Sequence, residues 1–327
     1  MKIGKIPETV LKRSVLSQIH NRREEVLLGA SVGEDCAAVA VAEDEMLVMS
    51  TDPITGTVQD IGELAVQITV NDLASAGAEP IGVMLTVLLP ERVSEQKMRN
   101  MISQAEAACA KVSVQIMGGH TEVTKAVNQP LISVTGVGKA KKGRLVSTAG
   151  ARPGMDMIIT KWAGIEGTAI LAKEKEEQLR TRFTQSFIDQ AKAFDQMLSV
   201  LPEAEIAVRN GVAAMHDVTE GGIFGALWEM AEASGVGLEI DLKKIPLRQE
   251  TVEICEFFDI NPYELISSGC MLMAAADGNT IVRELEKAGI HAVVAGKAVK
   301  GNDRVLYAAG EKRFLEPPKA DELYKVV

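Results

Sequence analysis

The chain has 327 residues, 46% of them hydrophobic and 24% charged, which is the composition of a soluble globular protein with room for two domains. Its formal net charge of −10 argues against broad binding to nucleic acid or to anionic membranes, and no apolar run reaches the roughly 18 residues of a membrane helix. Four widely spaced cysteines without a CxxC pair argue against a disulfide framework or a structural zinc site and fit a reducing, cytoplasmic compartment.

The first half of the chain predicts strands alternating with helices. Compact apolar runs that end at turn residues indicate strands over 45–50, 81–89, 112–117 and 131–137. Helical spacing and capping signals indicate helices over 61–77 and from an N-cap at Ser94 to Lys111. We therefore expect an α/β domain over residues 1–150.

The second half begins after a Lys-, Gly- and Arg-rich segment, 139–153, which is the best candidate boundary. Strands are predicted over 156–161, 212–215, 237–242, 270–275 and from 292 and 304. Helices are predicted over 168–177, 183–201, 222–233, 249–258 and 280–288, with Pro202 ending the second of them. The polar tail from Pro317 is expected to be less ordered, and residues 151–327 form the second domain.

Five short motifs place an Asp or a His beside small residues where an apolar stretch meets a turn. They are GEDCAAV (33–39), STDPITG (50–56), TVNDLASAGAEP (69–80), GGHTEV (118–123) and HDVTEGGIFGAL (216–227). A carboxylate in such a place is expensive to bury unless a cation or a hydrogen-bond donor meets it. The motifs together favour a shared magnesium–phosphate site, and so an enzyme that uses ATP.

Each motif also has an ordinary structural explanation. Asp35 and Asp52 could cap turns, and the Asn71–Asp72 pair in an apolar helix could cap a neighbouring helix. Three such acids beside small residues nevertheless match Mg²⁺, which takes one or two carboxylates with phosphate oxygens and water. The three acids together therefore indicate a Mg²⁺ site more specifically than any one of them does alone.

The glycine motifs are individually weak signals. Gly118–Gly119 would let backbone approach a ligand, while His120 is more often structural than catalytic. Asp217 and the glycines after it lie at a strand–turn–helix junction, where helix N–H groups favour anions, although a tight turn with an Asp cap looks the same. There is no Walker or GxGxxG sequence. Cys36 and Cys270 have no visible activating neighbour, and we predict that both are buried.

The order and spelling of the motifs resemble the superfamily of aminoimidazole ribonucleotide (AIR) synthase, the hydrogenase maturation factor HypE, thiamine-monophosphate kinase and selenophosphate synthetase. The resemblance covers nearly the whole chain, and the stretch 245–275 looks most like HypE. It implies an α/β plus α+β architecture: an N-terminal domain, 1–150, that binds ATP and Mg²⁺ and dimerises through its sheet, and a C-terminal AIR-synthase-like domain, 151–327.

The resemblance also implies roles for the motif residues. Catalytic roles fall to Asp72, Asp217 and His120. Magnesium ligands would be Asp35, Asp52, Asp72 and Asp217. The nucleotide would contact Gly33, Asp35, Asp52, Asn71, Gly118, Gly119, Thr121, Gly221 and Gly222.

The sequence departs from each relative in turn. HypE ends in a Pro-Arg-x-Cys tail whose cysteine carries the carbamoyl group to be dehydrated, whereas the last cysteine here is Cys270. HypE tends to have Asp at the place of His120 and Arg at the place of Glu220. The Cys/Sec and Lys segment of selenophosphate synthetase is not evident near 1–15, and the GGDTT pattern of thiamine-phosphate kinase is broken at His120.

We therefore expect a cytoplasmic, homodimeric, Mg²⁺-dependent ATP-binding enzyme that phosphorylates or activates an oxygen of a small or carrier-bound substrate, with no nucleic acid or membrane partner. One alternative is hydrogenase maturation on a thiol that another protein supplies. Another is a non-catalytic nucleotide-binding regulator, and AIR synthase itself is a weaker third. The phosphoryl acceptor stays open.

Overall fold

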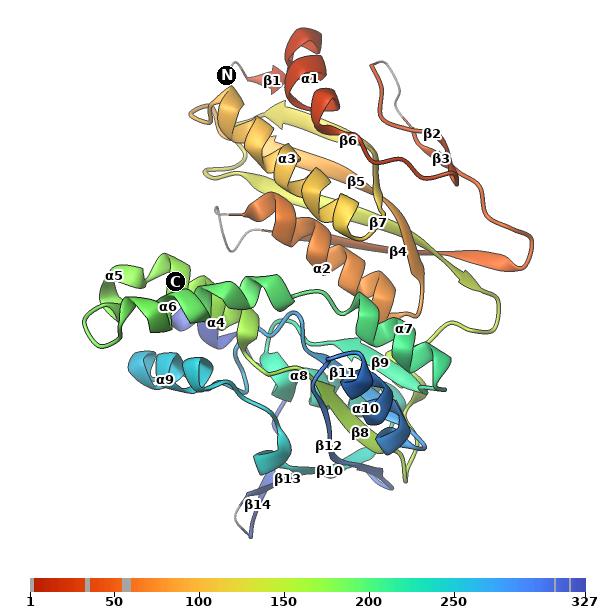
Figure 1. The fold of residues 1–327 in the computed structure, drawn as a ribbon, viewed down its shortest axis with the longest axis vertical. Coiled ribbons are helices and arrows are strands. Elements are labelled where there is room, and N and C mark those ends of the chain that lie inside the picture. The colour runs from red at the N-terminus through yellow and green to blue at the C-terminus, as the bar shows by residue number, and fades with distance from the viewer. Residues whose placement is uncertain (1–2, 33–35, 55–59, 309, 318) are drawn as a thin grey trace. The chain divides into compact units, whose positions relative to one another are not determined.

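The chain divides into two compact units, one of residues 1–74 and 78–145 and the other of residues 75–77 and 146–327. A computed structural model describes residues 3–32, 36–54, 60–308, 310–317 and 319–327 (Figure 1). Both units combine a sheet with helices, which confirms the predicted α/β plus α+β class.

The first unit is built on a five-stranded sheet with the order β1–β6–β5–β7–β4. Its strands are β1 (Gly4–Lys5), β4 (Glu45–Ile54), β5 (Glu79–Leu89), β6 (Gln115–Val123) and β7 (Leu131–Lys141). Strands β5 and β6 are parallel, and the other neighbours are antiparallel. A separate small hairpin consists of β2 (Val26–Leu28) and β3 (Ala38–Val39).

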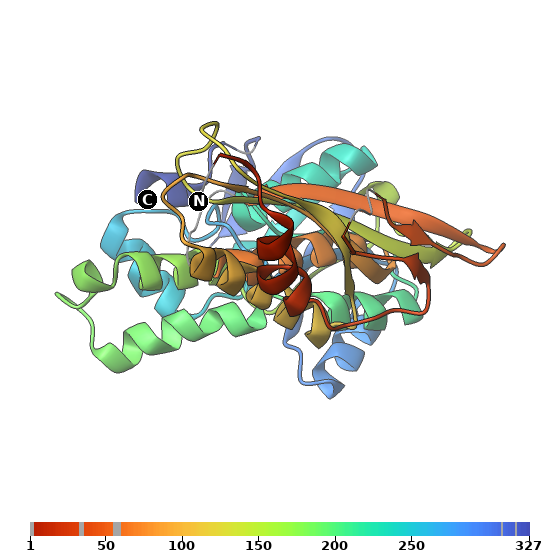
Figure 2. The ribbon, with the colours of Figure 1, turned by 90° about the horizontal axis from the view of Figure 1, so that it is seen from above.

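One face of this sheet is covered by α1 (Glu8–Ser14), α2 (Ile61–Ser75) and α3 (Glu95–Lys111) (Figure 2). Alternation along β4 follows from this arrangement: Met46 and Val48 pack with α2, whereas Leu47 and Met49 on the other face are 47% and 63% exposed. The predicted cap of α3 is confirmed, because the hydroxyl of Ser94 accepts a hydrogen bond from the N–H of Lys97.

Strand β6 differs from its prediction. We expected a strand over 112–117 with the GGHTEV motif after it, but the strand runs over Gln115–Val123 and contains the whole motif. Parallel pairing with β5 explains the difference, since Leu85 lies opposite Gly119 and Thr86 opposite His120. His120 is therefore a strand residue and not a turn residue.

The second unit contains a seven-stranded sheet with the order β14–β13–β10–β12–β8–β11–β9, in which only β10 and β13 are parallel among the described pairs. The strands are β8 (Asp156–Thr160), β9 (Ala214–Asp217), β10 (Gly237–Asp241), β11 (Met271–Ala275), β12 (Ala292–Val299), β13 (Arg304–Ala308) and β14 (Glu311–Phe314). The fully buried strand β11 occupies an inner position, as its unbroken apolar sequence predicts.

The helices of this unit are α4 (Ile165–Glu174), α5 (Glu176–Leu179), α6 (Gln185–Lys192), α7 (Leu201–Arg209), α8 (Gly222–Ser234), α9 (Gln249–Phe258) and α10 (Gly278–Lys287). Helix α9 has the predicted bounds. The single helix predicted over 183–201 is wrong: α6 passes into a 3₁₀ turn, Ala193–Met197, and Pro202 lies in the first turn of α7. Proline suits that position because the first N–H groups of a helix have no intrahelical acceptor.

The expectation of a less ordered tail is also wrong for the described residues after 318. Glu322–Lys325 form a 3₁₀ turn, and Asp321 caps it by accepting a hydrogen bond from the N–H of Leu323. The side chain of Leu323 is only 5% exposed and packs in a core with α4, α6 and α9. Apolar burial of this kind offsets the loss of chain entropy.

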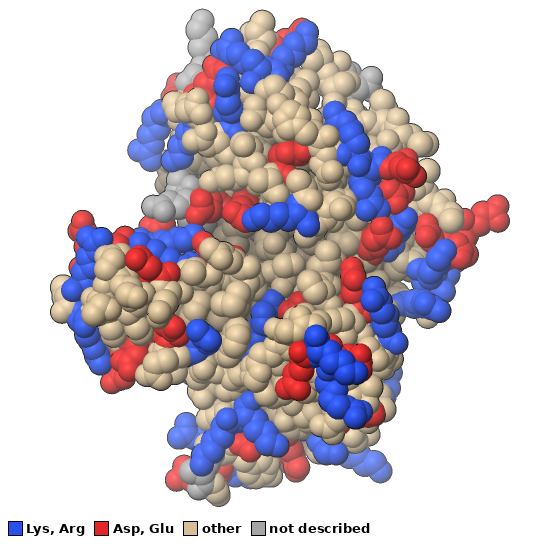
Figure 3. All heavy atoms as spheres, in the orientation of Figure 1, with Lys and Arg blue, Asp and Glu red and all other residues tan. Residues whose placement is uncertain are grey.

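Lysine, arginine and acidic side chains are intermixed over the face drawn in Figure 3. Within the described ranges we find no helix with the length and apolar character that crossing a membrane requires.

Candidate functional site

Two of the predicted magnesium ligands lie close together in the first unit. The hydroxyl of Ser50 donates to Asp72 in a short hydrogen bond and lies 3.3 Å from Oδ2 of Asp52. Ser50 and Asp52 are two residues apart on β4, so both side chains point toward α2, which carries Asp72. A single hydroxyl thus brings two carboxylates from separate elements to one place.

This pair fits a magnesium ion by the chemistry of its donors. Mg²⁺ is usually held by one or two carboxylates and completes its shell with phosphate oxygens and water. Among the described residues no group of three or more His, Cys, Asp or Glu side chains could hold a metal, so phosphate and water would supply the remaining ligands. The predicted residues Gly33 and Asp35 lie outside the described residues.

Asn71 precedes Asp72 on α2 but points elsewhere. Its side chain is fully buried, and its Oδ1 accepts a hydrogen bond from Nε2 of Gln67 at 3.0 Å, one helical turn away. These contacts describe a buried amide inside the helix layer.

The glycine pair of β6 produces a close backbone approach. Gly119 has a φ of +143°, and a Cβ there would lie 2.0 Å from the carbonyl oxygen of Leu85. At Gly118 the nearest atom to a Cβ would be Cε of Met84, at an ordinary 3.5 Å. Only Gly119 is sterically required to be glycine.

A cavity of about 420 Å³ lies at this edge of the sheet. In the described part of the chain strand β1 pairs with Glu122 and Val123, and the residues of β6 just before them, 118–121, line the cavity. Polar lining comes from Ser31, Thr86, Gly118, Gly119, His120, Thr121 and Thr135, and apolar lining comes mainly from the N-terminal segment, including Ile6, Leu11 and Val15. The size and mixed lining suit a small-molecule ligand.

The structure separates His120 from the carboxylate pair. Directly paired residues on neighbouring strands share a face, and the register places His120 with Thr86 and Ser133 on the face away from the helices. Asp52 lies on the helix-covered face, toward α2. His120 is 46% exposed, and its Nε2 lies 3.3 Å from Oε2 of Glu122.

In the second unit the predicted residues surround the start of α8. Asp217 is the last residue of β9 and is 5% exposed. Gly221 and Gly222 both have positive φ, and a Cβ on Gly222 would lie 2.6 Å from the carbonyl oxygen of Tyr263. The N–H of Gly221 donates at 2.8 Å to the carboxylate of Asp321 in the C-terminal segment. This helix start therefore does bind an anionic group, and that group belongs to the chain itself.

A second acid, Glu166, is buried near Asp321. It accepts a hydrogen bond from the N–H of Ser268 at 3.0 Å. The pKa of Glu166 is raised to about 7, mainly by burial; the hydrogen bonds from Ser268 oppose this rise, and the nearby carboxylates of Asp321 and Glu220 add to it. Burial also raises the pKa of Asp321. Glu220 in turn accepts a 2.5 Å hydrogen bond from the hydroxyl of Tyr324.

Of the two cysteines predicted to be buried, one is buried and the other is exposed. Cys270 is fully buried as predicted, and burial raises the pKa of its thiol to about 12, which disfavours the reactive thiolate. Cys36 is exposed, so its predicted burial is wrong.

Sequence reasoning missed Ser50, Glu166 and Asp321. Ser50 stands in the STDPITG motif two residues before Asp52, and strand alternation could have placed both on one face. Nothing local to Glu166 or Asp321 signals their roles, because both depend on contacts between segments about 100 residues apart.

Comparison with known proteins gives the same picture of the fold. The carbamoyl dehydratase HypE of Cupriavidus necator is 30% identical over 76% of this chain and 72% of its own length. The selenide, water dikinase of Methanocaldococcus jannaschii is 28% identical over 95% of this chain and 94% of its own. A crystal structure of the hydrogenase maturation protein HypE in complex with ATP superimposes with a TM-score of 0.81 at 22% identity, covering 98% of this chain and 97% of that one.

Family profiles cover most of the sequence. The N-terminal domain of AIR synthase related proteins matches residues 33–140, and the C-terminal domain of the same family matches residues 152–308. With HypE and selenide, water dikinase among its relatives, the chain belongs to the family of AIR synthase related proteins and has its two-domain, PurM-like fold.

Proposed function

We propose that this protein is a Mg²⁺-dependent ATP-binding enzyme that phosphorylates or activates an oxygen of a small or carrier-bound substrate. The observation that carries the proposal is the convergence of Asp52 and Asp72 on the hydroxyl of Ser50. Both carboxylates are half-buried, and a divalent cation beside two such negative charges would be attracted to both. The likeness to a HypE crystallised with ATP supports the choice of nucleotide.

The protein's part in such a reaction is positioning and charge neutralisation. Bound Mg²⁺-ATP would supply the phosphoryl group. Asp52 and Asp72 would hold the ion, and Ser50 would keep their carboxylates together. Gly119 and Thr121 share the helix-covered face of the sheet with Asp52, so we assign the phosphate contacts to them. Gly118 and His120 line the cavity from the other face, and we assign them no contact with the ion.

A HypE-like dehydration on a carrier is the acceptor chemistry that the comparisons favour. In that reaction the γ-phosphoryl group would go to the carbonyl oxygen of a carbamoyl group on sulfur, with release of ADP. The C–O bond would then break as phosphate leaves with that oxygen and the nitrogen gives up its two protons, and the product is a thiocyanate.

The buried thiol of Cys270, with its pKa of about 12, does not suit the carrier role. Cys109 and Cys255 are buried as well, whereas Cys36 is exposed. We propose that the carrier thiol comes from another protein, and Cys36→Ser, which removes the exposed thiol of this chain, should then leave the reaction unchanged.

Turnover tests this proposal. ADP release from Mg²⁺-ATP is measured with a peptide carrying an S-carbamoyl cysteine and, separately, with small hydroxyl and phosphate acceptors. We expect release with at least one acceptor and its loss in Asp72→Asn. Tight ATP binding without turnover on any acceptor would instead support a regulatory protein.

We also propose that the first unit forms a homodimer through its sheet. Strand β4 is an outer strand of that sheet, and its Met49 and Leu47 lie exposed on the face away from the helices, where proteins usually cover apolar side chains.

Sedimentation should therefore give about 70 kDa, twice the 35.0 kDa of the chain, and Met49→Glu should give the monomer because a charge would be buried at the interface. Leu145→Glu, at a position 49% exposed outside β4, is the matched control and should stay dimeric. A dimer that survives Met49→Glu would contradict this interface.

A further inference from the structure

The hairpin of β2 and β3 has very little apolar anchoring. Leu27 and Leu28 are 73% and 39% exposed, and Ala38 on the partner strand is exposed. Among the described residues the two strands pair at Val26 with Val39 and at Leu28 with Ala38. An isolated two-stranded hairpin is marginally stable in water, so other interactions must hold this one in place.

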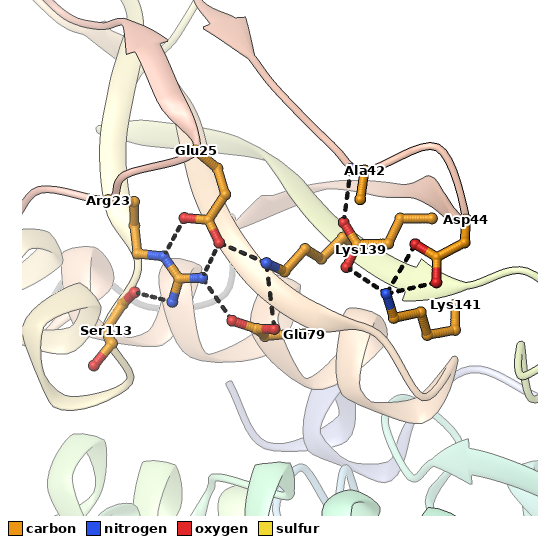
Figure 4. A network of polar contacts seen from close by, with 9 residues as sticks. Arg23, Glu25, Ala42, Asp44, Glu79, Ser113, Lys139 and Lys141 are labelled. Atoms are coloured by element: carbon orange, nitrogen blue, oxygen red, sulfur yellow. Dashed lines mark hydrogen bonds and ion pairs between the residues drawn. The ribbon is translucent and has the colours of Figure 1, made fainter.

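Four charged side chains supply that anchor (Figure 4). The guanidinium of Arg23 donates two hydrogen bonds to Glu25, at 2.9 and 2.7 Å, and one to Glu79 at 2.6 Å. Nζ of Lys139 lies 2.6 Å from Glu25 and 3.7 Å from Glu79. The network thus joins the segment before β2 to β5 and β7 of the sheet.

This network is shielded from solvent at its centre. The side chains of Arg23, Glu25 and Lys139 are only 17%, 19% and 18% exposed. The hydrogen bonds from Arg23, followed by those from Lys139, outweigh partial burial and lower the pKa of Glu25 to about 2. Partly buried, bidentate pairs of this kind are stronger and less screened by salt than exposed ones.

Backbone contacts carry the anchor into the hairpin. The N–H of Arg23 donates to Oε1 of Gln115 on β6 at 2.7 Å, and the N–H of Ala40 donates to the carbonyl of Glu25 at 2.8 Å. Gly29 lies directly against Gln115, because a Cβ there would be 2.8 Å from its Nε2. Both ends of the hairpin are therefore tied to the same polar cluster.

The hairpin matters for the site because β2 leads directly into a wall of the cavity. Ala30 and Ser31, the second and third residues after Leu28, line the cavity together with Gly118 and His120. We propose that Arg23, Glu25 and Lys139 are positioning residues, which fix the Ala30–Ser31 wall of the cavity without touching the ligand. This inference rests on the proposed function only in naming the ligand as Mg²⁺-ATP.

The test compares two lysines that lie two residues apart on β7. Lys139→Met breaks the shielded network. Lys141→Met removes a half-exposed lysine whose Nζ lies 2.8 Å from the exposed Asp44 and 3.4 Å from Glu45. We expect about tenfold weaker Mg²⁺-ATP binding in Lys139→Met and less than about twofold change in Lys141→Met. Lys139→Arg should restore binding, and kcat on any acceptor should change little.

A second readout needs no nucleotide. Ser31→Cys in a Cys36→Ser background places a thiol on the cavity wall, and its rate of labelling reports how firmly that wall is held. Lys139→Met should raise the labelling rate and the amide exchange of Val26, Leu28 and Ala40 by about tenfold, with the midpoint of global unfolding little changed. Lys141→Met should change neither the labelling rate nor the amide exchange.

The two readouts separate the possible failures. If the unmodified protein binds no Mg²⁺-ATP, the proposed function fails, and labelling alone decides the positioning role. The positioning role is overturned if Lys139→Met leaves three quantities unchanged: the labelling rate of the thiol at position 31, the amide exchange of the hairpin and the affinity for Mg²⁺-ATP. An equal loss of global stability and of binding, not restored by Lys139→Arg, would also overturn it.

Discussion

Gly119→Ala is expected to lower the free energy of unfolding by about 3 kcal/mol or more. Two effects combine. A φ of +143° is strained for any residue with a side chain, and the new Cβ would lie 2.0 Å from the carbonyl oxygen of Leu85. Backbone atoms of a central strand cannot move aside cheaply, so β6 must shift against β5. Chemical denaturation followed by circular dichroism measures the change.

Gly118→Ala is the matched control. It adds the same methyl group one residue earlier, where the nearest atom is a flexible methionine Cε at 3.5 Å. We expect a change within about 1 kcal/mol. Equal stability of the two variants would contradict the described backbone of the GGHTEV motif.

The second large effect concerns Glu166 and pH. Its pKa is raised by burial to about 7 in the folded protein, from an ordinary 4.5. Below pH 4.5 both states carry the proton, so there is no penalty. As the pH rises from 4.5 to 7 the unfolded state releases its proton while the folded state keeps it, and the free energy of unfolding falls by about 3 kcal/mol.

Glu166→Gln removes this titration and keeps an oxygen that can accept from the N–H of Ser268. The variant should therefore gain about 3 kcal/mol relative to the parent between pH 4.5 and pH 8. Denaturation at several pH values measures it, with Glu205→Gln, an exposed acid on α7, as the control. A difference that stays constant with pH would show that the pKa of Glu166 is not raised in the folded protein.

Local patterns were sufficient for much of the fold. Helix α9 and the capped start of α3 follow from spacing and from Ser94, and strands β4, β5, β6 and β7 are predicted with shifted ends, whereas β1 and β2 are not predicted. The predictions of element boundaries were wrong at residues that are compatible with two kinds of local structure. Pro202 was interpreted as a helix stop although proline also favours a first turn, and the glycines of β6 were interpreted as a turn.

For the candidate site, sequence indicated the residues but not their grouping. The motifs named Asp52, Asp72 and His120 together, while strand register places His120 on the other face of the sheet from Asp52. Such separation depends on which strands pair, which no local window contains. The contact between Gly221 and Asp321, 100 residues apart, was hidden for the same reason.

Calorimetric titration with ATP, with and without Mg²⁺, tests the central claim most directly. We expect metal-dependent binding that Asp72→Asn weakens by about 30-fold or more, because asparagine keeps a hydrogen-bond acceptor for Ser50 but removes the charge. Asp44→Asn, an exposed acid on the same unit, should bind like the parent. Absent binding in the parent, or unchanged binding in Asp72→Asn, would contradict a magnesium–nucleotide site at Asp52 and Asp72.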